Sequence, residues 1–205
     1  MFDEINVSYS KAFEKFGDTS SSVMIPKNNQ YLRFDSVISF LPKKNHLKII
    51  DYGCGLAHFY EHLIANWPYE FEYIGVDINK EFLDHNKTKY KEATFVERDK
   101  FLLMKNKFDF VVCIGTFNLK YKKNNFENQQ FVFQEIQKIW DKTQKSLYVN
   151  FMSTVVDFQQ ENAYHQDVGS IYKFFCARLT RNVVIDSTYL PYEFSIVGNR
   201  KENQK

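Results

Sequence analysis

The sequence predicts an α/β fold with a mostly parallel sheet and one reversed strand. From residue 47 onward, short strand-like runs alternate with segments whose apolar residues recur at helical spacing. Five strand–helix pairs follow one another in this way, and parallel strands require such crossover connections. The last two strand-like runs, 181–189 and 192–199, are only a few residues apart. They must therefore form an antiparallel hairpin.

The strands and helices have recognisable signatures. Residues 108–115 are almost continuously apolar, which is typical of a strand buried on both faces. Pro68 ends the first helix after the first strand. Before the hairpin, the predicted strands are 47–53, 73–78, 94–99, 108–115 and 146–153, and the predicted helices are 56–67, 80–91, 124–141 and 168–179.

Two amphipathic helices precede this pattern. The second carries an apolar stripe from Phe34 to Leu41, and the polar loop 17–29 links it to the first. We expect residues 1–45 to form an N-terminal helical cap and residues 46–200 to form the main domain. The cap and the domain are expected to make a single compact unit.

Composition limits the partners and the compartment. The 205 residues include 27 basic and 25 acidic ones, so the net charge of +2 does not favour a polyanion such as nucleic acid. The three cysteines are far apart and form no CxxC pair, which predicts neither a metal site nor disulfides and fits reduced thiols in the cytoplasm. No run approaches the roughly 18 apolar residues of a membrane span, so no membrane contact is expected.

Two of the seven glycines, Gly53 and Gly55, lie in the loop after the first strand, and Gly115 follows the fourth. In an open parallel sheet, ligands bind outside the carboxyl ends of the strands. Gly53 permits a sharp turn, and Gly55 lets the backbone approach a ligand closely. The helix that follows offers free N–H groups to a polar ligand. The loop is therefore predicted to bind a cofactor.

Two cofactors compete for this loop, a dinucleotide and S-adenosylmethionine. Asp77 ends the second strand and suits the ribose hydroxyls of either one. Asp51, just before the glycines, lies badly beside a pyrophosphate but suits a ligand with an ammonium and a sulfonium. The closing hairpin also fits poorly with a dinucleotide domain. These features favour S-adenosylmethionine over NAD.

The segments IIDYGCGLA, YIGVDIN, FVERD and FDFVVCIGTFN together resemble class I S-adenosylmethionine-dependent methyltransferases. The resemblance covers residues 47–118 by motif and extends to residue 199 by strand order. It implies a Rossmann-like, seven-stranded, mostly parallel sheet with a reversed last strand and helices on both faces. It also implies a transferase that holds its cofactor over the first loop.

The resemblance assigns cofactor roles to individual residues. The methionine part would lie against Asp51, Gly53 and Gly55, the ribose against Asp77, and the adenine against Ile78 and Asp99, with Gly115 completing the cofactor-binding set. Each acid also has a structural alternative. Asp51 and Asp99 would fit as helix caps, and Asp77 as a turn residue.

Gln30 and Arg33 lie three residues apart and so share one face of the second helix. The planar fork of arginine matches a carboxylate with two parallel hydrogen bonds. We therefore hypothesise that Arg33, assisted by Gln30, holds the carboxylate of the cofactor. The alternative is an ordinary surface arginine.

The acceptor is expected near the loop after the fourth strand. An Asn/Asp-Pro-Pro-aromatic motif, which goes with base methylation in the resembling family, is missing there. His165 and Tyr164 follow the fifth strand and are predicted as general base and acceptor contact, with a plain surface loop as the alternative. The predicted function is methyl transfer to an O or N atom of a small molecule, such as a sugar or a nucleotide-linked metabolite. The alternatives are a protein or RNA methyltransferase, an NAD-dependent reductase and a non-catalytic cofactor-binding domain.

Overall fold

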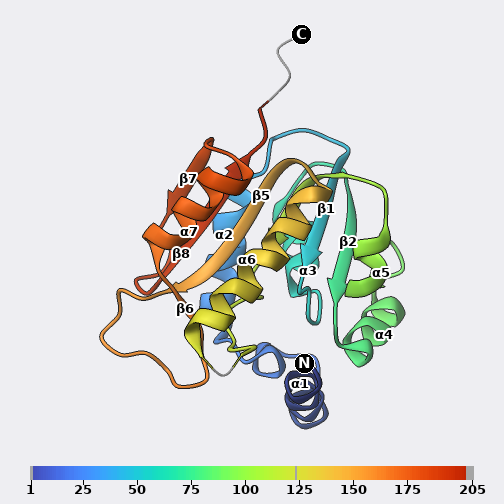
Figure 1. Ribbon diagram of the computed structural model, residues 1–205. Coiled ribbons are helices and arrows are strands. Elements are labelled where there is room, and N and C mark those ends of the chain that lie inside the picture. Colours follow the sequence, from blue (N-terminus) through green and yellow to red (C-terminus); the bar gives the residue numbers. More distant parts are fainter. Residues whose placement is uncertain (1, 123, 202–205) are drawn as a thin grey trace. The chain divides into compact units, whose positions relative to one another are not determined.

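A computed structural model describes residues 2–122 and 124–201 (Figure 1). The chain divides into two compact units, Met1–Met104 and Lys105–Lys205. The two helices of the predicted cap lie in the first unit, together with three strands. The second unit holds the remaining strands, among them the closing hairpin.

The sheet of the first unit is parallel. Its strands β1 (Leu47–Tyr52), β2 (Phe71–Asp77) and β3 (Thr94–Glu97) lie in the order β3-β2-β1. The helices after them are α3 (His58–Asn66), α4 (Lys80–Lys89) and α5 (Arg98–Leu103). Because all three strands run the same way, their carboxyl ends meet at one edge, and Asp77 lies opposite Glu97 there.

The N-terminal segment of the first unit folds as α1 (Asp3–Phe16), the 3-10 turn η1 (Ser20–Val23) and α2 (Lys27–Phe40). Figure 1 shows α1, in dark blue, beyond the arrowheads of β1 and β2. The ring of Phe13 packs edge-on against Phe82 and His85 of α4, at centroid distances of 5.5 and 5.2 Å. The first helix of the predicted cap is thus fastened beside the carboxyl edge of β2.

The sheet of the second unit is mixed. Its strands β4 (Phe108–Cys113), β5 (Thr143–Ser153), β7 (Val183–Asp186) and β8 (Glu193–Asn199) lie in the order β4-β5-β8-β7. Strand β4 is parallel to β5, whereas β8 is antiparallel to both β5 and β7. A two-residue strand, β6 (His165–Gln166), pairs with the carboxyl end of β5.

Three helical segments belong to the second unit: α6 (Asn125–Lys142), α7 (Val168–Phe174) and the π-helical turn η2 (Phe175–Leu179). Phe133 of α6 stacks on Phe174 of α7 at a centroid distance of 4.3 Å. The two helices therefore lie side by side, as their yellow and red ribbons show in Figure 1.

The fold class and the antiparallel hairpin predicted from the sequence are confirmed. Most predicted boundaries differ from the observed ones by one to three residues, and two of these differences have a structural reason. Strand β5 begins at Thr143, because the pairing with β4 continues across a register shift at the start of β4. The third strand ends at Glu97, because the next six residues form α5. The short strand β6 was not predicted, since two residues carry no periodicity.

Gly75 lies inside β2 and serves packing. A Cβ atom at this position would lie 2.7 Å from the ring of Phe95 and 2.9 Å from the sulfur of Cys54. Real side chains do not come so close, so the Phe95 ring occupies the space that a larger residue would need.

We therefore expect Gly75→Ala to lower the free energy of unfolding by about 1–3 kcal/mol through overpacking. The measurement is urea denaturation. Gly169→Ala is the control, because its Cβ would meet only Asp167 Oδ1 at 3.4 Å and helix α7 would gain about 0.5–1 kcal/mol. Equal midpoints for Gly75→Ala and the wild type would contradict this packing account.

Candidate functional site

The loop between β1 and α3 makes a tight turn that is fixed to β2. Gly53 and Gly55 have φ angles of 84° and 53°, and Ala57, which caps α3, has 57°. The N–H groups of Gly53 and Cys54 both donate to the carbonyl of Val76, at 2.7 and 3.0 Å. Positive φ angles strain most residues with side chains, which explains the glycines at the first two positions.

Asp77, at the end of β2, holds the same loop. Its Oδ2 accepts a hydrogen bond from the N–H of Gly55 at 2.8 Å, and its Oδ1 accepts one from Asn79 at 2.8 Å. The N–H of Ile78 also stabilises the carboxylate. An ionised carboxylate offers about four lone-pair sites, so these three donors leave room for a further one, such as a hydroxyl.

Asp51 is the second acid beside the loop, and it is 2% exposed. Burial raises the pKa of its carboxyl to about 7, against the opposing hydrogen bond that Tyr73 donates at 2.7 Å, and the charge of Asp77 adds to the rise. Burial also raises the pKa of Asp77. Two desolvated acids close together favour a positively charged ligand.

The cap helix α2 turns its polar face inward. Gln30 and Arg33 are 7% and 6% exposed, so Arg33 is not an ordinary surface arginine. The side chain of Gln30 lies 3.1 Å from Nδ1 of His58, the first residue of α3. Burial and the charge of Asp77 raise the pKa of Tyr9, whereas the charge of Arg33 lowers it. Arg33 and Asp77 are thus both near the Tyr9 hydroxyl.

Asp18 fastens the polar loop after α1, a contact that sequence reasoning missed. Its Oδ1 lies 2.9 Å from His58 Nε2, and its Oδ2 lies 2.9 Å from His85 Nε2 and 2.6 Å from Lys89 Nζ. Burial opposes ionisation, but the bonds from Lys89, His85 and His58 prevail and lower the pKa of Asp18 to about 2. The loop therefore contributes an ionised acid that joins α3 and α4.

The fastened loop covers Gly55. A Cβ atom built on Gly55 would lie 3.0 Å from a methyl carbon of Val23, at the end of η1. The carbonyl of Gly55 accepts a bond from Asn86 of α4 at 2.8 Å. The backbone of Gly55 is thus held from both strand and helix, and a side chain there would collide.

The predicted adenine contacts lie farther along the sheet edge. Ile78 directly follows Asp77 and is half-buried. Asp99 is 87% exposed, lies in the first turn of α5 and forms an ion pair with Arg98. It does not cap the helix, because Glu97 occupies that position. Arg98, which the sequence did not single out, donates to the hydroxyl of Tyr52 at 3.0 Å.

In the second unit, Gly115 follows β4 with a φ angle of 73°. Its N–H donates to the side-chain oxygen of Asn150 at 3.1 Å. The Asn150 amide nitrogen donates to the Tyr189 hydroxyl at 2.7 Å and to Glu193 Oε2 at 2.9 Å. Asn150 is an amide inside an apolar strand, a signal that sequence reasoning passed over.

The loops after β4 and β5 are joined through Asn118. Its side-chain oxygen accepts from the N–H of Met152 at 3.0 Å, and its backbone carbonyl accepts from Tyr164 at 2.9 Å. The hydroxyl of Tyr164 donates to Gln166 at 2.7 Å, and His165 lies 2.7 Å from the Ser153 carbonyl. Tyr164 and His165 therefore lie beside the loop where the acceptor was predicted.

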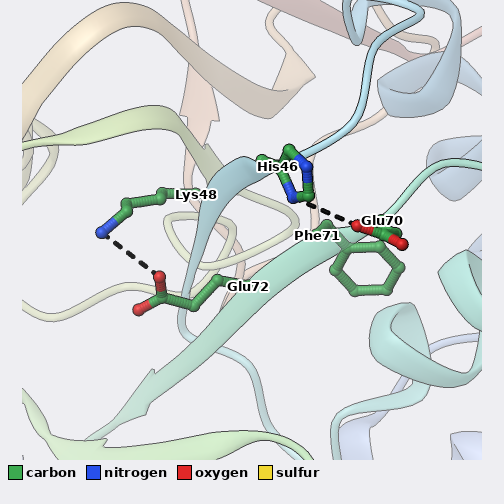
Figure 2. Close-up of a pocket in the computed structure, with 5 residues that line it drawn as sticks. All are labelled: His46, Lys48, Glu70, Phe71 and Glu72. Atoms are coloured by element: carbon green, nitrogen blue, oxygen red, sulfur yellow. Dashed lines mark ion pairs between the residues drawn. The ribbon is translucent and has the colours of Figure 1, made fainter.

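A shallow hollow lies at the other edge of the first unit's sheet, where β1 and β2 begin (Figure 2). It is lined by Phe71 and two exposed pairs, His46 with Glu70 at 3.1 Å and Lys48 with Glu72 at 3.3 Å. Lys48 and Glu72 compensate each other's charge, and exposed pairs of this kind contribute little. We therefore do not treat the hollow as the functional site.

Residues 2–122 and 124–201 contain neither a metal-ion cluster nor a helix that could span a membrane. Within these ranges, no group of three or more His, Cys, Asp or Glu side chains is placed to hold a metal ion. In the same part of the chain, no helix has the length and apolarity needed to cross a membrane.

Comparisons with known proteins agree with this geometry. A model of a methyltransferase domain family matches residues 43–183. An S-adenosylmethionine-dependent methyltransferase from Aquifex aeolicus is 11% identical, with 93% of this chain and 97% of that chain covered and a TM-score of 0.59. Phosphoethanolamine N-methyltransferase 1 from Haemonchus contortus, in complex with S-adenosylhomocysteine, is 11% identical, with 95% of this chain and 48% of that chain covered and a TM-score of 0.65. No curated protein sequence matches the chain.

The fold and the glycine loop thus define a Rossmann-like methyltransferase. The chain belongs to the methyltransferase domain family. The prediction of an enzyme that uses S-adenosylmethionine is confirmed, and the dinucleotide reductase is set aside.

The raised pKa of Asp51 makes stability depend on pH. In the folded state its carboxyl keeps a proton up to about pH 7, whereas its ordinary value is 3.8. Stability is therefore lost as pH rises between these values, because unfolding releases the proton. Asp51→Asn cannot ionise, so it should escape a loss on the order of 2–3 kcal/mol between pH 5 and pH 8.

Urea denaturation of the ligand-free protein at both pH values measures this effect. Asp84→Asn, which removes an exposed carboxylate on α4, is the control and should follow the wild type. If Asp51→Asn and the wild type lose stability in parallel between pH 5 and pH 8, Asp51 does not titrate as described.

Proposed function

We propose that this methyltransferase acts on an oxygen or nitrogen atom of a small molecule and holds its cofactor at the glycine loop of the first unit. The observation that carries the cofactor assignment is the pair of desolvated acids beside the glycine loop, Asp51 and Asp77, of which Asp77 accepts a hydrogen bond from the Gly55 N–H. S-adenosylmethionine brings an ammonium and a sulfonium to such a site. Its positive charges would lower the desolvation cost of the two carboxylates.

The residues present fit the parts of the cofactor. Asp77 has room for a ribose hydroxyl after its three backbone bonds. Gly53 and Gly55 place no side chain of their own between the loop backbone and the methionine part. Asp51 would receive the ammonium. Ile78, half-buried next to Asp77, would pack against the adenine.

Asp99 and Gly115 are the two remaining residues that we propose for cofactor binding. Asp99 follows the strand end next to Asp77, and its carboxylate reaches solvent, where an adenine amino group could donate to it. Gly115 would lie at the carboxyl end of β4 with its N–H held by Asn150.

Two features support a small acceptor over a nucleic acid or a protein. The net charge of +2 provides no broad attraction for a polyanion. The loops after β4 and β5 are tied to each other by Asn118, which limits how far they can separate around a large acceptor.

The proposed cofactor site is tested by calorimetry with S-adenosylhomocysteine and NAD. The wild type should bind S-adenosylhomocysteine and not NAD. Asp77→Ala should weaken binding about 10- to 150-fold, because hydrogen bonds to a charged acceptor are lost. The control is Asp84→Ala, an exposed acid on α4. Binding of NAD, or unchanged affinity in Asp77→Ala, would contradict the assignment.

The role of Arg33 has its own test. Arg33→Lys keeps the charge and loses the fork, so affinity for S-adenosylhomocysteine should fall about 5- to 30-fold. Affinity for 5′-methylthioadenosine, which lacks the carboxylate, should not change. Arg178→Lys, an exposed arginine, is the matched control. An equal loss of affinity for both ligands would show that Arg33 does not hold the carboxylate.

A further inference from the structure

The hydroxyl of Tyr73 holds the buried acid Asp51 from the neighbouring strand of the first unit. Tyr73, in β2, is 2% exposed and donates a hydrogen bond to Oδ2 of Asp51, in β1, at 2.7 Å. Asp51 pairs in register with Gly75, and Tyr73 lies two residues before Gly75 on the same face of β2. Glycine at this position places no side chain between the phenol and the acid.

Ring packing fixes the direction of this hydrogen bond. The Tyr73 ring lies 4.8 Å from the ring of Tyr60 in α3 and 6.2 Å from the ring of Phe95 in β3, measured between centroids. Phe95 packs in turn against Tyr90, the residue that follows α4, at 6.1 Å. The phenol is enclosed by aromatic side chains, so its hydroxyl has little freedom to move away from Asp51.

The bond favours one charge state of Asp51. Burial raises the pKa of the Asp51 carboxyl to about 7, and the hydrogen bond from Tyr73 opposes this rise because it stabilises the charged form. Burial and the charge of Asp51 raise the pKa of Tyr73 well above its ordinary value, so the hydroxyl stays protonated and keeps donating. Near neutral pH, a single hydrogen bond therefore decides whether the acid is charged.

Asp77, Cys54 and Tyr90 also face this pair. Asp77, at the end of β2, raises the pKa of Asp51 through its charge. Burial raises the pKa of the Cys54 thiol and of the Tyr90 hydroxyl, and both groups act on Tyr73. Cys54 and Tyr90 are therefore neutral near pH 7, so the charge that acts on Asp51 there is that of Asp77.

We propose that Tyr73 is a positioning residue for cofactor binding: its hydroxyl keeps Asp51 oriented and ionised for the ammonium group of S-adenosylmethionine. Tyr73 takes up Oδ2, and an ionised carboxylate retains lone pairs on Oδ1 for a second donor. When Asp51 is protonated, its charge no longer attracts the ammonium, and affinity falls. Tyr73 thus sets the pH range in which the loop binds a cationic amino acid group. The inference rests on the proposed function, in which Asp51 receives the ammonium.

The first test compares the wild type with Tyr73→Phe in calorimetric binding of S-adenosylhomocysteine at pH 7.0 and pH 8.5. The variant keeps the ring that packs against Tyr60 and Phe95 and loses only the hydroxyl. Its affinity should be about 5- to 50-fold below that of the wild type at pH 7.0, and less than about 5-fold below at pH 8.5, because Asp51 ionises again. A purely structural defect would lower affinity by the same factor at both pH values.

Two comparisons assign the effect to Asp51 and to the ammonium. In an Asp51→Asn background, Tyr73→Phe should change affinity less than about 2-fold at either pH, because no charge is left to control. 5′-Methylthioadenosine lacks the ammonium, so Tyr73→Phe should bind it as the wild type does. The matched control is Tyr60→Phe, which removes a hydroxyl from the ring packed against Tyr73 and should follow the wild type at both pH values.

The second test follows Asp51 itself by carbon-13 NMR of its side-chain carboxyl in the ligand-free protein, with Asp51→Asn used to assign the signal. The midpoint of its titration should lie about 1–2 pH units higher in Tyr73→Phe than in the wild type. An unchanged midpoint, an unchanged affinity for S-adenosylhomocysteine, or an equal loss of affinity at pH 7.0 and pH 8.5 would overturn the proposal.

The wild type separates failure of the proposal from failure of the proposed function. If the wild type does not bind S-adenosylhomocysteine at either pH, the proposed cofactor site is refuted and the role of Tyr73 falls with it. If the wild type binds and Tyr73→Phe shows a loss that does not depend on pH, only the role of Tyr73 is refuted.

Discussion

The hydrogen bond from the Gly55 N–H to the Asp77 carboxylate is the constraint on which the proposed cofactor site depends. It joins the loop after β1 to the end of β2 at 2.8 Å, where Gly55 has a φ angle of 53°. Asn86 holds the carbonyl of the same residue. The loop is therefore shaped before any ligand binds, so little ordering cost is left for binding.

This arrangement has an electrostatic cost. Asp51 and Asp77 are both desolvated, and burial raises the pKa of each carboxyl. The cap adds one positive charge, Arg33, which lies near the Tyr9 hydroxyl as Asp77 does. The two desolvated acids therefore lower the free energy of unfolding of the ligand-free protein. Binding of a cationic ligand then stabilises the folded state through linkage.

The fold and the glycine loop could be predicted from local features of the sequence. The glycines between a strand and a helix predict the cofactor loop, and the short connection between the last two strands predicts the hairpin. Both features act over short distances in the chain. Asp18, by contrast, lies in an unremarkable polar loop, and its partners are 40 to 71 residues away in the chain. The end of β3 depended on whether Arg98 and Asp99 continued a strand or began a helix, which tertiary packing decides. The bond from Tyr73 to Asp51 likewise becomes visible only when β2 is placed beside β1.

A crystal structure with S-adenosylhomocysteine tests the central claim most directly, because the claim is that Asp77 serves the loop and the cofactor at once. The account predicts a ribose hydroxyl bonded to Asp77 while the Gly55 N–H keeps its bond to the same carboxylate. A ligand bound away from Asp77, or bound there only after the Gly55 bond has broken, would contradict it.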